Sequence, residues 1–247
     1  MSSLKKIPLL LKKRPLSLKK TEVLPAPIVK ATEERKEPVS HEHAVVKGLY
    51  YYPNFLSLDE GKAVMKELDS NSQWVGVTSN PKSRRVIHYG YIYPYTGGPL
   101  QKTDPIPQSY SPMMAKLRET LITPLQNSVQ DGSIGLPSPM LFDQLIINEY
   151  LTGQGIAAHT DHTSKFGPIV ACITLGSGVE IEFTKGGGAK QVDTQSVYVE
   201  PNSLYVMSGD SRYIWKHAIH KRKSDMVNGK SIPRGKRVSL TFRKAIV

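Results

Sequence analysis

Residues 144–162 carry the sequence Q-L-I-I-N-E-Y-L-T-G-Q-G-I-A-A-H-T-D-H, and this stretch decides the fold. Its first seven residues alternate in the manner of a β-strand, so that Ile146, Asn148 and Tyr150 share one face. Two polar side chains therefore point the same way from an otherwise apolar strand. The glycines that follow permit a sharp turn, after which the chain resumes as a second extended segment.

His159 and Asp161 end this second segment, and because they stand two residues apart they share a face. An imidazole and a carboxylate are two of the three ligands of the 2-His-1-carboxylate triad, which binds Fe(II) and leaves coordination positions open. A short H-x-D sequence is also compatible with a surface turn whose carboxylate is solvated. A third ligand elsewhere in the chain decides between the two interpretations.

Further strands are predicted by short β-branched runs that are separated by turn signals. The predicted strands are residues 144–150, 169–175, 179–183, 196–199, 203–207, 213–216 and 238–243. So many short strands predict a mainly β fold of the α+β class, a sandwich or barrel with two helices packed outside.

The two helices are predicted from capping signals and periodicity. Ser57 is the expected N-cap of the first helix, because Glu60 stands three residues later and completes a capping box. The residues expected on its inward face are Leu58, Ala63, Val64 and Leu68. The second helix is predicted over residues 113–129, with a break at Pro124.

The length of 247 residues suits one main domain, and the net charge of +12 favours acidic partners. Residues 1–44 hold 10 Lys and Arg, 5 Asp and Glu, and little apolar periodicity. We therefore expect a disordered basic arm, followed by a domain over residues 45–247. The arm is interpreted as a nucleic-acid contact, a nuclear import signal or a solubilising tail.

The single cysteine, Cys172, lies in the apolar run I-V-A-C-I-T-L and is interpreted as a core residue. A chain without disulfides fits a reducing compartment, and no apolar run reaches membrane length. We therefore expect an intracellular monomer in the cytoplasm or the nucleus, without a membrane partner.

Residues 84–95, R-R-V-I-H-Y-G-Y-I-Y-P-Y, combine two arginines, a histidine and four tyrosines. One interpretation is a strand with an aromatic edge. The other is a surface that clamps a nucleobase, in which planar side chains stack on the base and an arginine binds phosphate. The residues expected to contact such a substrate are Arg84, Arg85, His88 and Tyr89.

The final predicted strand lies within residues 237–243, R-V-S-L-T-F-R, where cations and hydroxyls share one face and apolar side chains share the other. A face of this kind suits a dicarboxylate, since the planar fork of arginine binds a carboxylate through two hydrogen bonds. The alternative is an exposed edge strand that is guarded by the charges of Arg237 and Arg243.

Together these motifs resemble the AlkB family of Fe(II)- and 2-oxoglutarate-dependent dioxygenases. The resemblance covers about residues 45–247 and rests on N-E-Y at 148–150, H-T-D at 159–161, W-K-H-A-I at 215–219 and R-V-S-L-T-F-R at 237–243. The runs S-G-D-S-R-Y-I-W-K-H and T-F-R-K are most similar to the branch that contains the tRNA wobble-uridine hydroxylases. The methyltransferase domain that this branch can carry is not expected in these residues.

The resemblance implies a double-stranded β-helix, or jelly-roll, core, with Fe(II) as the metal and 2-oxoglutarate and O2 as co-substrates. His217 is preferred to His220 as the distal ligand because it directly follows W-K. The implied metal ligands are thus His159, Asp161 and His217. The implied contacts to 2-oxoglutarate are Asn148, Tyr150, Arg237, Ser239 (where several family members have asparagine) and Arg243.

The reaction implied by the resemblance couples oxidative decarboxylation of 2-oxoglutarate to hydroxylation of a C–H bond on a modified base of RNA or DNA. On an N-methyl group the hydroxylated product releases formaldehyde, whereas on a base side chain the alcohol stays. Two alternatives remain open. One is a nucleic-acid-binding module that keeps the fold without oxidation, and the other is a 2-oxoglutarate oxygenase that acts on protein or a small molecule.

Overall fold

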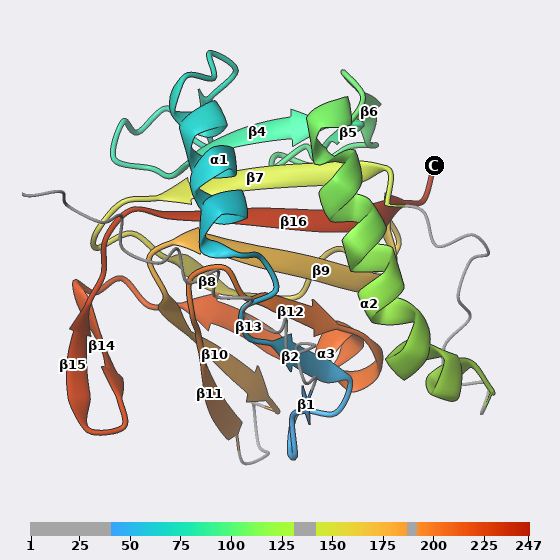
Figure 1. Ribbon diagram of the computed structural model, residues 1–247, viewed down its shortest axis with the longest axis vertical. Helices are drawn as coiled ribbons and strands as arrows, with labels where there is room; N and C mark the ends of the chain where they lie inside the picture. The colour runs from blue at the N-terminus through green and yellow to red at the C-terminus, as the bar shows by residue number, and fades with distance from the viewer. Residues whose placement is uncertain (1–40, 131–141, 187–191) are drawn as a thin grey trace, which may run out of the picture. The chain divides into compact units, whose positions relative to one another are not determined.

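The computed structural model describes residues 41–130, 142–186 and 192–247, and two antiparallel sheets form its centre (Figure 1). The larger sheet has the strand order β1 (His41–Glu42), β2 (Leu49–Tyr52), β12 (Leu204–Met207), β9 (Phe166–Gly176), β16 (Arg237–Ala245), β7 (Gln144–Tyr150), β4 (Arg85–Tyr89) and β3 (Val75–Gly76). The smaller sheet has the order β11 (Asp193–Val199), β10 (Val179–Lys185), β13 (Lys216–Ile219) and β8 (Ile156–His159).

Two small hairpins and a few helices complete the part of the chain that the structure describes. The hairpins pair β5 (Tyr91–Ile92) with β6 (Gln101–Lys102), and β14 (Ser224–Val227) with β15 (Lys230–Pro233). The helices are α1 (Leu58–Asp69), the 3-10 helix η1 (Gln108–Tyr110), α2 (Ser111–Gln130) and α3 (Gly209–Tyr213). This architecture confirms the mainly β, jelly-roll fold with flanking helices.

The alternation in β16 gives the larger sheet two different faces. Val238, Leu240 and Phe242 pack into the core beneath α1 and α2, whereas Ser239 and Thr241 face the other way, toward the smaller sheet. β16 pairs with β7 on one side and β9 on the other, so it is a central strand. The alternative interpretation, an edge strand guarded by charge, is therefore wrong.

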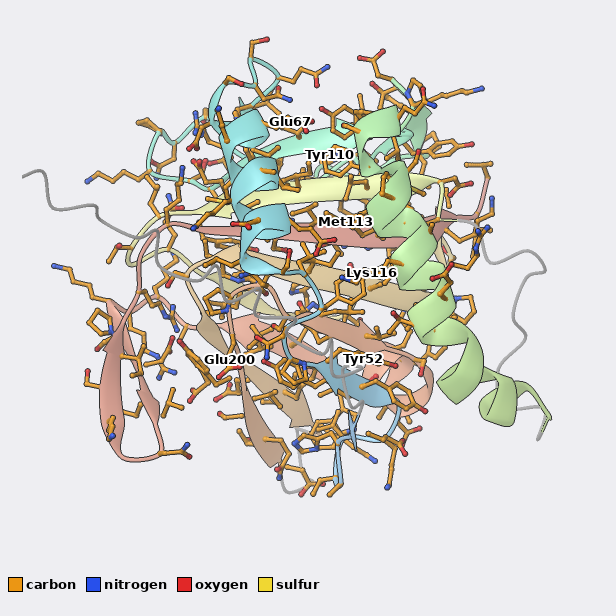
Figure 2. The ribbon with its side chains drawn as sticks, in the orientation of Figure 1. Tyr52, Glu67, Tyr110, Met113, Lys116 and Glu200 are labelled. Atoms are coloured by element: carbon orange, nitrogen blue, oxygen red, sulfur yellow. The ribbon has the colours of Figure 1, made fainter. Side chains whose placement is uncertain are left out.

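Each face of the larger sheet has its own apolar core. On the helix side, Leu117 and Leu121 of α2 are fully buried, and Tyr110 and Met113 belong to the same cluster (Figure 2). Between the sheets, a second cluster is built around Cys172 and aromatic residues such as Phe183. Burying one side chain of this size contributes roughly 1.5–3 kcal/mol. The free Cys172 is buried, which confirms its interpretation as a core residue.

Helix α1 begins as the sequence predicts, but of its expected inward face only Leu68 and, in part, Val64 are buried. The Ser57 hydroxyl accepts a bond from the backbone N–H of Glu60 (3.2 Å), and the Glu60 carboxylate accepts one from the backbone N–H of Ser57 (2.7 Å). Leu58, expected inside, is 62% exposed. The reason is Gly61, whose missing side chain lets the helix approach Asn202 so closely that a Cβ would lie 2.0 Å from its Oδ1. The buried residues of α1 are Gly61 and Leu68.

Two further predictions need correction. Helix α2 continues past Pro124 to Gln130 without the expected break. An interior proline weakens a helix locally, through one lost backbone bond and crowding of the preceding turn, but here the helical conformation continues on both sides of it. The expected strand at 213–216 is wrong, since a capping box at Ser208 begins the short helix α3, which ends at Tyr213. The strand β13 then begins at Lys216, three residues later than expected.

The boundary of the predicted arm also shifts. Residues 41–44 belong to the folded domain, because β1 pairs with β2 through His41 and Glu42. The rest of the predicted arm, residues 1–40, lies outside the described residues. Within the described ranges, no helix combines the length and the apolar composition needed to cross a bilayer.

Candidate active site between the two sheets

A cavity of about 260 Å³ lies between the inner faces of the two sheets. All eight residues that were predicted to bind the metal or 2-oxoglutarate line it: Asn148, Tyr150, His159, Asp161, His217, Arg237, Ser239 and Arg243. They come from β7, β8, β13, β16 and the turn after β8. Segments that are distant in the sequence therefore converge on one cavity.

The two histidines of the predicted triad lie side by side on adjacent strands of the smaller sheet. His217 of β13 pairs with His159 of β8, and their ring centroids are 4.3 Å apart. The Nδ1 of His159 lies 2.8 Å from the carbonyl oxygen of Ala157. Because a carbonyl can only accept, this contact makes Nδ1 the protonated nitrogen and leaves Nε2 with a free lone pair. That tautomer is the one that a metal ligand needs.

Asp161 presents one of its two carboxylate oxygens to the histidines. Its Oδ1 accepts a bond from Nη2 of Arg243 at 2.6 Å, whereas its buried Oδ2 has no hydrogen-bond partner among the described residues. The Oδ2 atom lies 4.0 Å from Nε2 of His217. Burial alone would raise the pKa of Asp161, but the surrounding positive groups, with Arg243 first among them, together outweigh burial and hold that pKa well below its ordinary value. The residue is therefore a carboxylate at neutral pH.

The protonation state of His217 also suits a metal ligand. Burial, together with the neighbouring His159, lowers the pKa of His217 to about 4. The ring is therefore neutral near pH 7, which is the form that binds metals. An ionised carboxylate beside two imidazole side chains is the donor set of a non-haem Fe(II) site.

The spacing of these donors is wider than a closed site requires. In the described ranges, no three His, Cys, Asp or Glu side chains already form a group that could hold a metal ion. Ligand atoms at right angles around one ion are about 3 Å apart when the bonds are about 2.1 Å long. The separation of 4.0 Å between Oδ2 of Asp161 and Nε2 of His217 is about 1 Å longer than this. The metal-binding role of the triad accordingly stays a prediction.

His220 occupies a different environment from His217. Its Nε2 lies 3.0 Å from Oε1 of Glu182, and the ring is largely exposed. It does not line the cavity between the sheets. Of the two late histidines, only His217 stands opposite His159.

Arg237 lies at one end of β16 and forms no ion pair with any carboxylate that the structure describes. Its Nη2 donates to the Thr174 hydroxyl at 3.0 Å, and its guanidinium lies 5.4 Å from the centre of the Tyr150 ring. The residue is only 4% exposed, and its Nε has no hydrogen-bond partner among the described residues. A buried cation without an anion is costly. This end of the cavity is therefore suited to the carboxylate of a ligand.

Arg243 lies six residues further along β16, about 20 Å away along the strand. Besides Asp161, it donates to Oε1 of Gln144 at 3.2 Å. Between the two arginines, the Ser239 hydroxyl lies 3.2 Å from that of Thr241 and 3.3 Å from the sulfur of Cys172. The two cations therefore occupy opposite ends of a wall that is lined with hydroxyl groups.

The four residues that were predicted to contact substrate separate onto two faces. Arg84 lines the cavity, where its Nε donates to Oδ1 of Asn148 at 3.2 Å and its guanidinium lies 5.9 Å from the Tyr95 ring centre. His88 contacts Tyr95 edge-to-face at 5.9 Å but is not part of the cavity lining. Burial, with a smaller contribution from Arg243, lowers the pKa of His88 to about 4.

Arg85 and Tyr89 point away from the cavity, because alternation along β4 directs them to the opposite face. Arg85 forms an ion pair with Glu149 at 2.8 Å and lies 5.2 Å from the Trp74 ring centre. Tyr89 is buried in the helix-side core and donates to Oε1 of Gln73 at 2.8 Å. Neither Arg85 nor Tyr89 therefore lies at the cavity that the predicted metal ligands line.

The replacement Tyr89→Phe should therefore affect stability and leave the reaction unchanged. It removes the bonds of the phenol to Gln73 and Asn71, which should lower the free energy of unfolding by roughly 1–2 kcal/mol. Chemical denaturation measures this loss, and succinate formation measures the reaction. A fall in turnover at unchanged stability would instead place Tyr89 on the substrate path.

Two tyrosines beyond β5 take the place of Arg85 and Tyr89 at the cavity. Tyr93 and Tyr95 both line it, with ring centroids 5.2 Å apart, and Tyr93 lies 5.8 Å from the Phe166 ring. Their alternate spacing in I-Y-P-Y was a signal available in the sequence, since residues two apart in an extended segment share a face.

Arg212 supports the site without lining it, and the sequence analysis did not select it. The side chain is only 1% exposed and donates to main-chain carbonyls in the turn between β8 and β9. Its bonds reach the carbonyl oxygens of Asp161 (2.7 Å), Phe166 (3.1 Å), Gly167 (3.2 Å) and His162 (3.4 Å). The turn that carries Asp161 is thereby held in one conformation.

Comparison with known proteins agrees with this geometry. A family model described as "2OG-Fe(II) oxygenase superfamily" matches residues 48–243. The chain is 31% identical over 201 residues to "Uncharacterized protein L905" of Acanthamoeba polyphaga mimivirus, and the match covers 81% of this chain and 86% of the relative. The match in sequence thus extends over both sheets and the cavity between them.

Other relatives carry more specific names. The chain is 31% identical over 216 residues to the Xenopus tropicalis "tRNA (carboxymethyluridine(34)-5-O)-methyltransferase alkbh8", covering 80% of this chain and 31% of the relative. It is 28% identical over 217 residues to the "Alkylated DNA repair protein ALKBH8 homolog" of Arabidopsis thaliana, covering 81% and 58%. The chain therefore spans about a third of the frog relative and little more than half of the plant one.

A solved structure supports the same fold. "The structure of OsALKBH1" matches with a TM-score of 0.56 and 18% sequence identity, and the match covers 80% of this chain and 96% of that one. At this level of identity the likeness concerns the fold alone.

Proposed function

The chain belongs to the 2OG-Fe(II) oxygenase superfamily, in its AlkB-like family, and from this premise we propose that it oxidises a modified base in nucleic acid. As a member it is a dioxygenase that uses Fe(II), 2-oxoglutarate and O2. The names of two relatives refer to tRNA and to alkylated DNA, which supports nucleic acid as the substrate class. The reaction on the base is either removal of an N-alkyl group or stable hydroxylation.

The observation that carries the proposal is the buried Oδ2 of Asp161, which has no hydrogen-bond partner among the described residues and lies beside His217. We assign Asp161, His159 and His217 as the metal ligands. Arg243 occupies Oδ1, so the carboxylate offers the ion a single oxygen in a fixed orientation. When bound, Fe(II) with 2-oxoglutarate and O2 supplies the oxidant that hydroxylates a C–H bond, with release of succinate and CO2.

Arg237 is assigned to the distal carboxylate of 2-oxoglutarate, because it is buried and lacks an anionic partner. Thr174 fixes the guanidinium from one side, and Tyr150 covers it from another. Asn148 and Ser239 are assigned as polar contacts along the same wall, and Arg243 as the cation at the metal end. These groups orient the co-substrate and keep water from its carboxylates.

Arg84, Tyr93 and Tyr95 are the residues that we assign to the nucleobase. Aromatic and guanidinium planes stack on bases, and a base must be unpaired or flipped to enter a cavity of this kind. All three side chains line the cavity that holds the predicted metal ligands. Since every residue of the proposed site comes from one chain, we propose that the protein acts as a monomer.

The test is iron-dependent succinate formation from 2-oxoglutarate, followed by a screen of modified RNA and DNA oligonucleotides with mass-spectrometric readout. We expect slow succinate formation by the protein alone and faster formation with the cognate modified strand. The strand should gain oxygen or lose its alkyl group in step with succinate. Removal of the metal with a chelator should stop both reactions. Iron-dependent turnover that responds to a protein or a small molecule, and to no oligonucleotide, would contradict the proposed substrate.

A further inference from the structure

Within the part of the chain that the structure describes, the hairpin β14–β15 is a strongly basic element that the active site does not use. Residues 221–236, K-R-K-S-D-M-V-N-G-K-S-I-P-R-G-K, contain six Lys and Arg and a single acid. We call these residues the basic hairpin. It follows directly after β13, the strand that carries His217 (Figure 1).

Two features hold the basic hairpin in one conformation. Its tip is the dipeptide Asn228–Gly229, where both residues have positive φ (49° and 76°), as a tight two-residue hairpin turn requires. Its base is fastened by Asp225, which is 1% exposed and accepts bonds from Nε of Arg234 (2.7 Å) and Nε of Arg222 (2.8 Å). The same carboxylate accepts a bond from the backbone N–H of Glu180 in β10 (3.1 Å), which ties the hairpin to the smaller sheet.

The cations of the basic hairpin divide into paired and unpaired groups. Arg222 and Arg234 are neutralised by Asp225, Arg222 also by Glu180, and Lys236 pairs with Asp69. The unpaired group consists of Lys221, Lys223 and Lys230, which are exposed and form no ion pair with any described carboxylate. The paired cations hold the hairpin in place, whereas the unpaired lysines leave three positive charges free to bind a ligand.

The spacing of the free lysines matches a nucleic-acid backbone. Arg234 donates its N–H to the carbonyl of Lys223, and Val227 pairs with Lys230, so Lys223 and Lys230 mark the two ends of the hairpin on one face. Four residues of strand separate these ends, which is about 13 Å. In a stacked, helical strand each nucleotide advances about 3.4 Å along the axis, so the lysines span about four nucleotides of such a strand.

We propose that the basic hairpin docks the phosphate backbone of the strand whose modified base enters the cavity, through Lys221, Lys223 and Lys230. This inference rests on the proposed function. The hairpin lies within reach of the site, because Lys221 is four residues beyond His217, at most about 13 Å along the chain. Contacts of this type position a strand without reading its sequence.

Salt dependence of binding tests the proposal directly. The triple variant Lys221→Gln, Lys223→Gln, Lys230→Gln is compared with the matched control Lys47→Gln, Lys62→Gln, Lys66→Gln, which removes the same charge from exposed lysines elsewhere. For a single strand of about 20 nucleotides, the slope of log K against log salt should become shallower by about 0.7 per lost contact, about 2 in total. The control should keep the slope of the parent protein. Equal slopes for both triple variants would overturn the proposal.

Substrate length supplies a second measurement. A modified trinucleotide can fill the cavity without reaching the hairpin, whereas the longer strand can occupy both. The hairpin variant should therefore raise KM for the long strand by 10-fold or more, leave KM for the trinucleotide unchanged, and keep succinate formation without substrate. An equal rise in KM for both lengths would contradict a docking role.

The two proposals fail in different ways. If the parent protein shows no turnover stimulated by nucleic acid, the proposed function fails, while the slopes of binding still decide the role of the hairpin. If stimulated turnover is present but the slopes are equal, only the hairpin proposal fails. Sedimentation with vesicles that contain phosphatidylserine tests a membrane surface as the alternative anionic partner. Vesicle binding that depends on these three lysines, with an unchanged salt-dependence slope for RNA binding, would overturn the assignment to nucleic acid.

Discussion

Replacing Asp161 by Asn should lower succinate formation by more than about 100-fold, the upper range for residues that merely orient a metal ligand. Asparagine keeps the shape of the side chain and can still accept a bond from Arg243, but it removes the charge beside His217 and His159. The same loss is expected for His217→Ala. Initial rates at saturating 2-oxoglutarate, together with Co(II) binding followed by absorbance, measure turnover and metal affinity separately.

His220→Ala is the matched control for this prediction. The ring is exposed and contacts Glu182 outside the cavity, so its loss should change turnover by less than about two-fold, as expected for a surface pair. Thermal unfolding of all three variants shows whether any loss follows from misfolding. If the His220→Ala protein were inactive and the His217→Ala protein remained active, the third ligand would be His220 and not His217.

Arg237→Ala should raise KM for 2-oxoglutarate by about 30-fold or more. Truncating one member of a buried, hydrogen-bonded charge pair costs about 2–5 kcal/mol, and each 1.36 kcal/mol corresponds to tenfold. Arg237 is buried and has no competing carboxylate among the described residues, so the co-substrate would lose its main anchor. Succinate rates at varied 2-oxoglutarate and direct binding without oxygen both report the change.

Two further variants should raise KM for 2-oxoglutarate less than Arg237→Ala does. Thr174→Val removes only the hydroxyl that fixes Arg237, so a rise of roughly 3- to 10-fold is expected from one lost hydrogen bond. Arg243→Lys keeps a cation beside Asp161 and should raise KM less than Arg237→Ala does. An unchanged KM after Arg237→Ala would remove this residue from the co-substrate site.

The sequence predicted those parts of the fold that depend on local alternation. In β7 and β16, every second residue faces the cavity, and the period of two in N-E-Y and R-V-S-L-T-F-R was sufficient to sort them. The basic hairpin was missed although Asn228–Gly229 is a strong turn signal. Its flanking strands are only four residues each and mix apolar, polar and charged side chains without alternation, so no apolar period marks them.

The remaining errors arise where both faces of an element are buried or where the contact is distant in the chain. Arg85, His88 and Tyr89 form a compact group in the sequence, but β4 distributes them over two faces of the sheet, and only the pairing with β7 decides which face is which. Arg212 binds the carbonyl of Asp161, 51 residues earlier, and no spacing within the sequence indicates that contact.

The hydrogen bonds of Arg212 also determine how readily the turn that carries Asp161 can unfold. The partners of this buried guanidinium are main-chain carbonyls of the turn after β8 and of the first two residues of β9. They are lost together if residues 161–167 unfold, and an unpaired charge then remains in the interior. Local fraying of residues 161–167 is therefore nearly as unfavourable as loosening the core that encloses Arg212. The turn belongs to the same cooperative unit as the sheets, so amide exchange within it should follow global unfolding although the segment has the sequence of a surface loop.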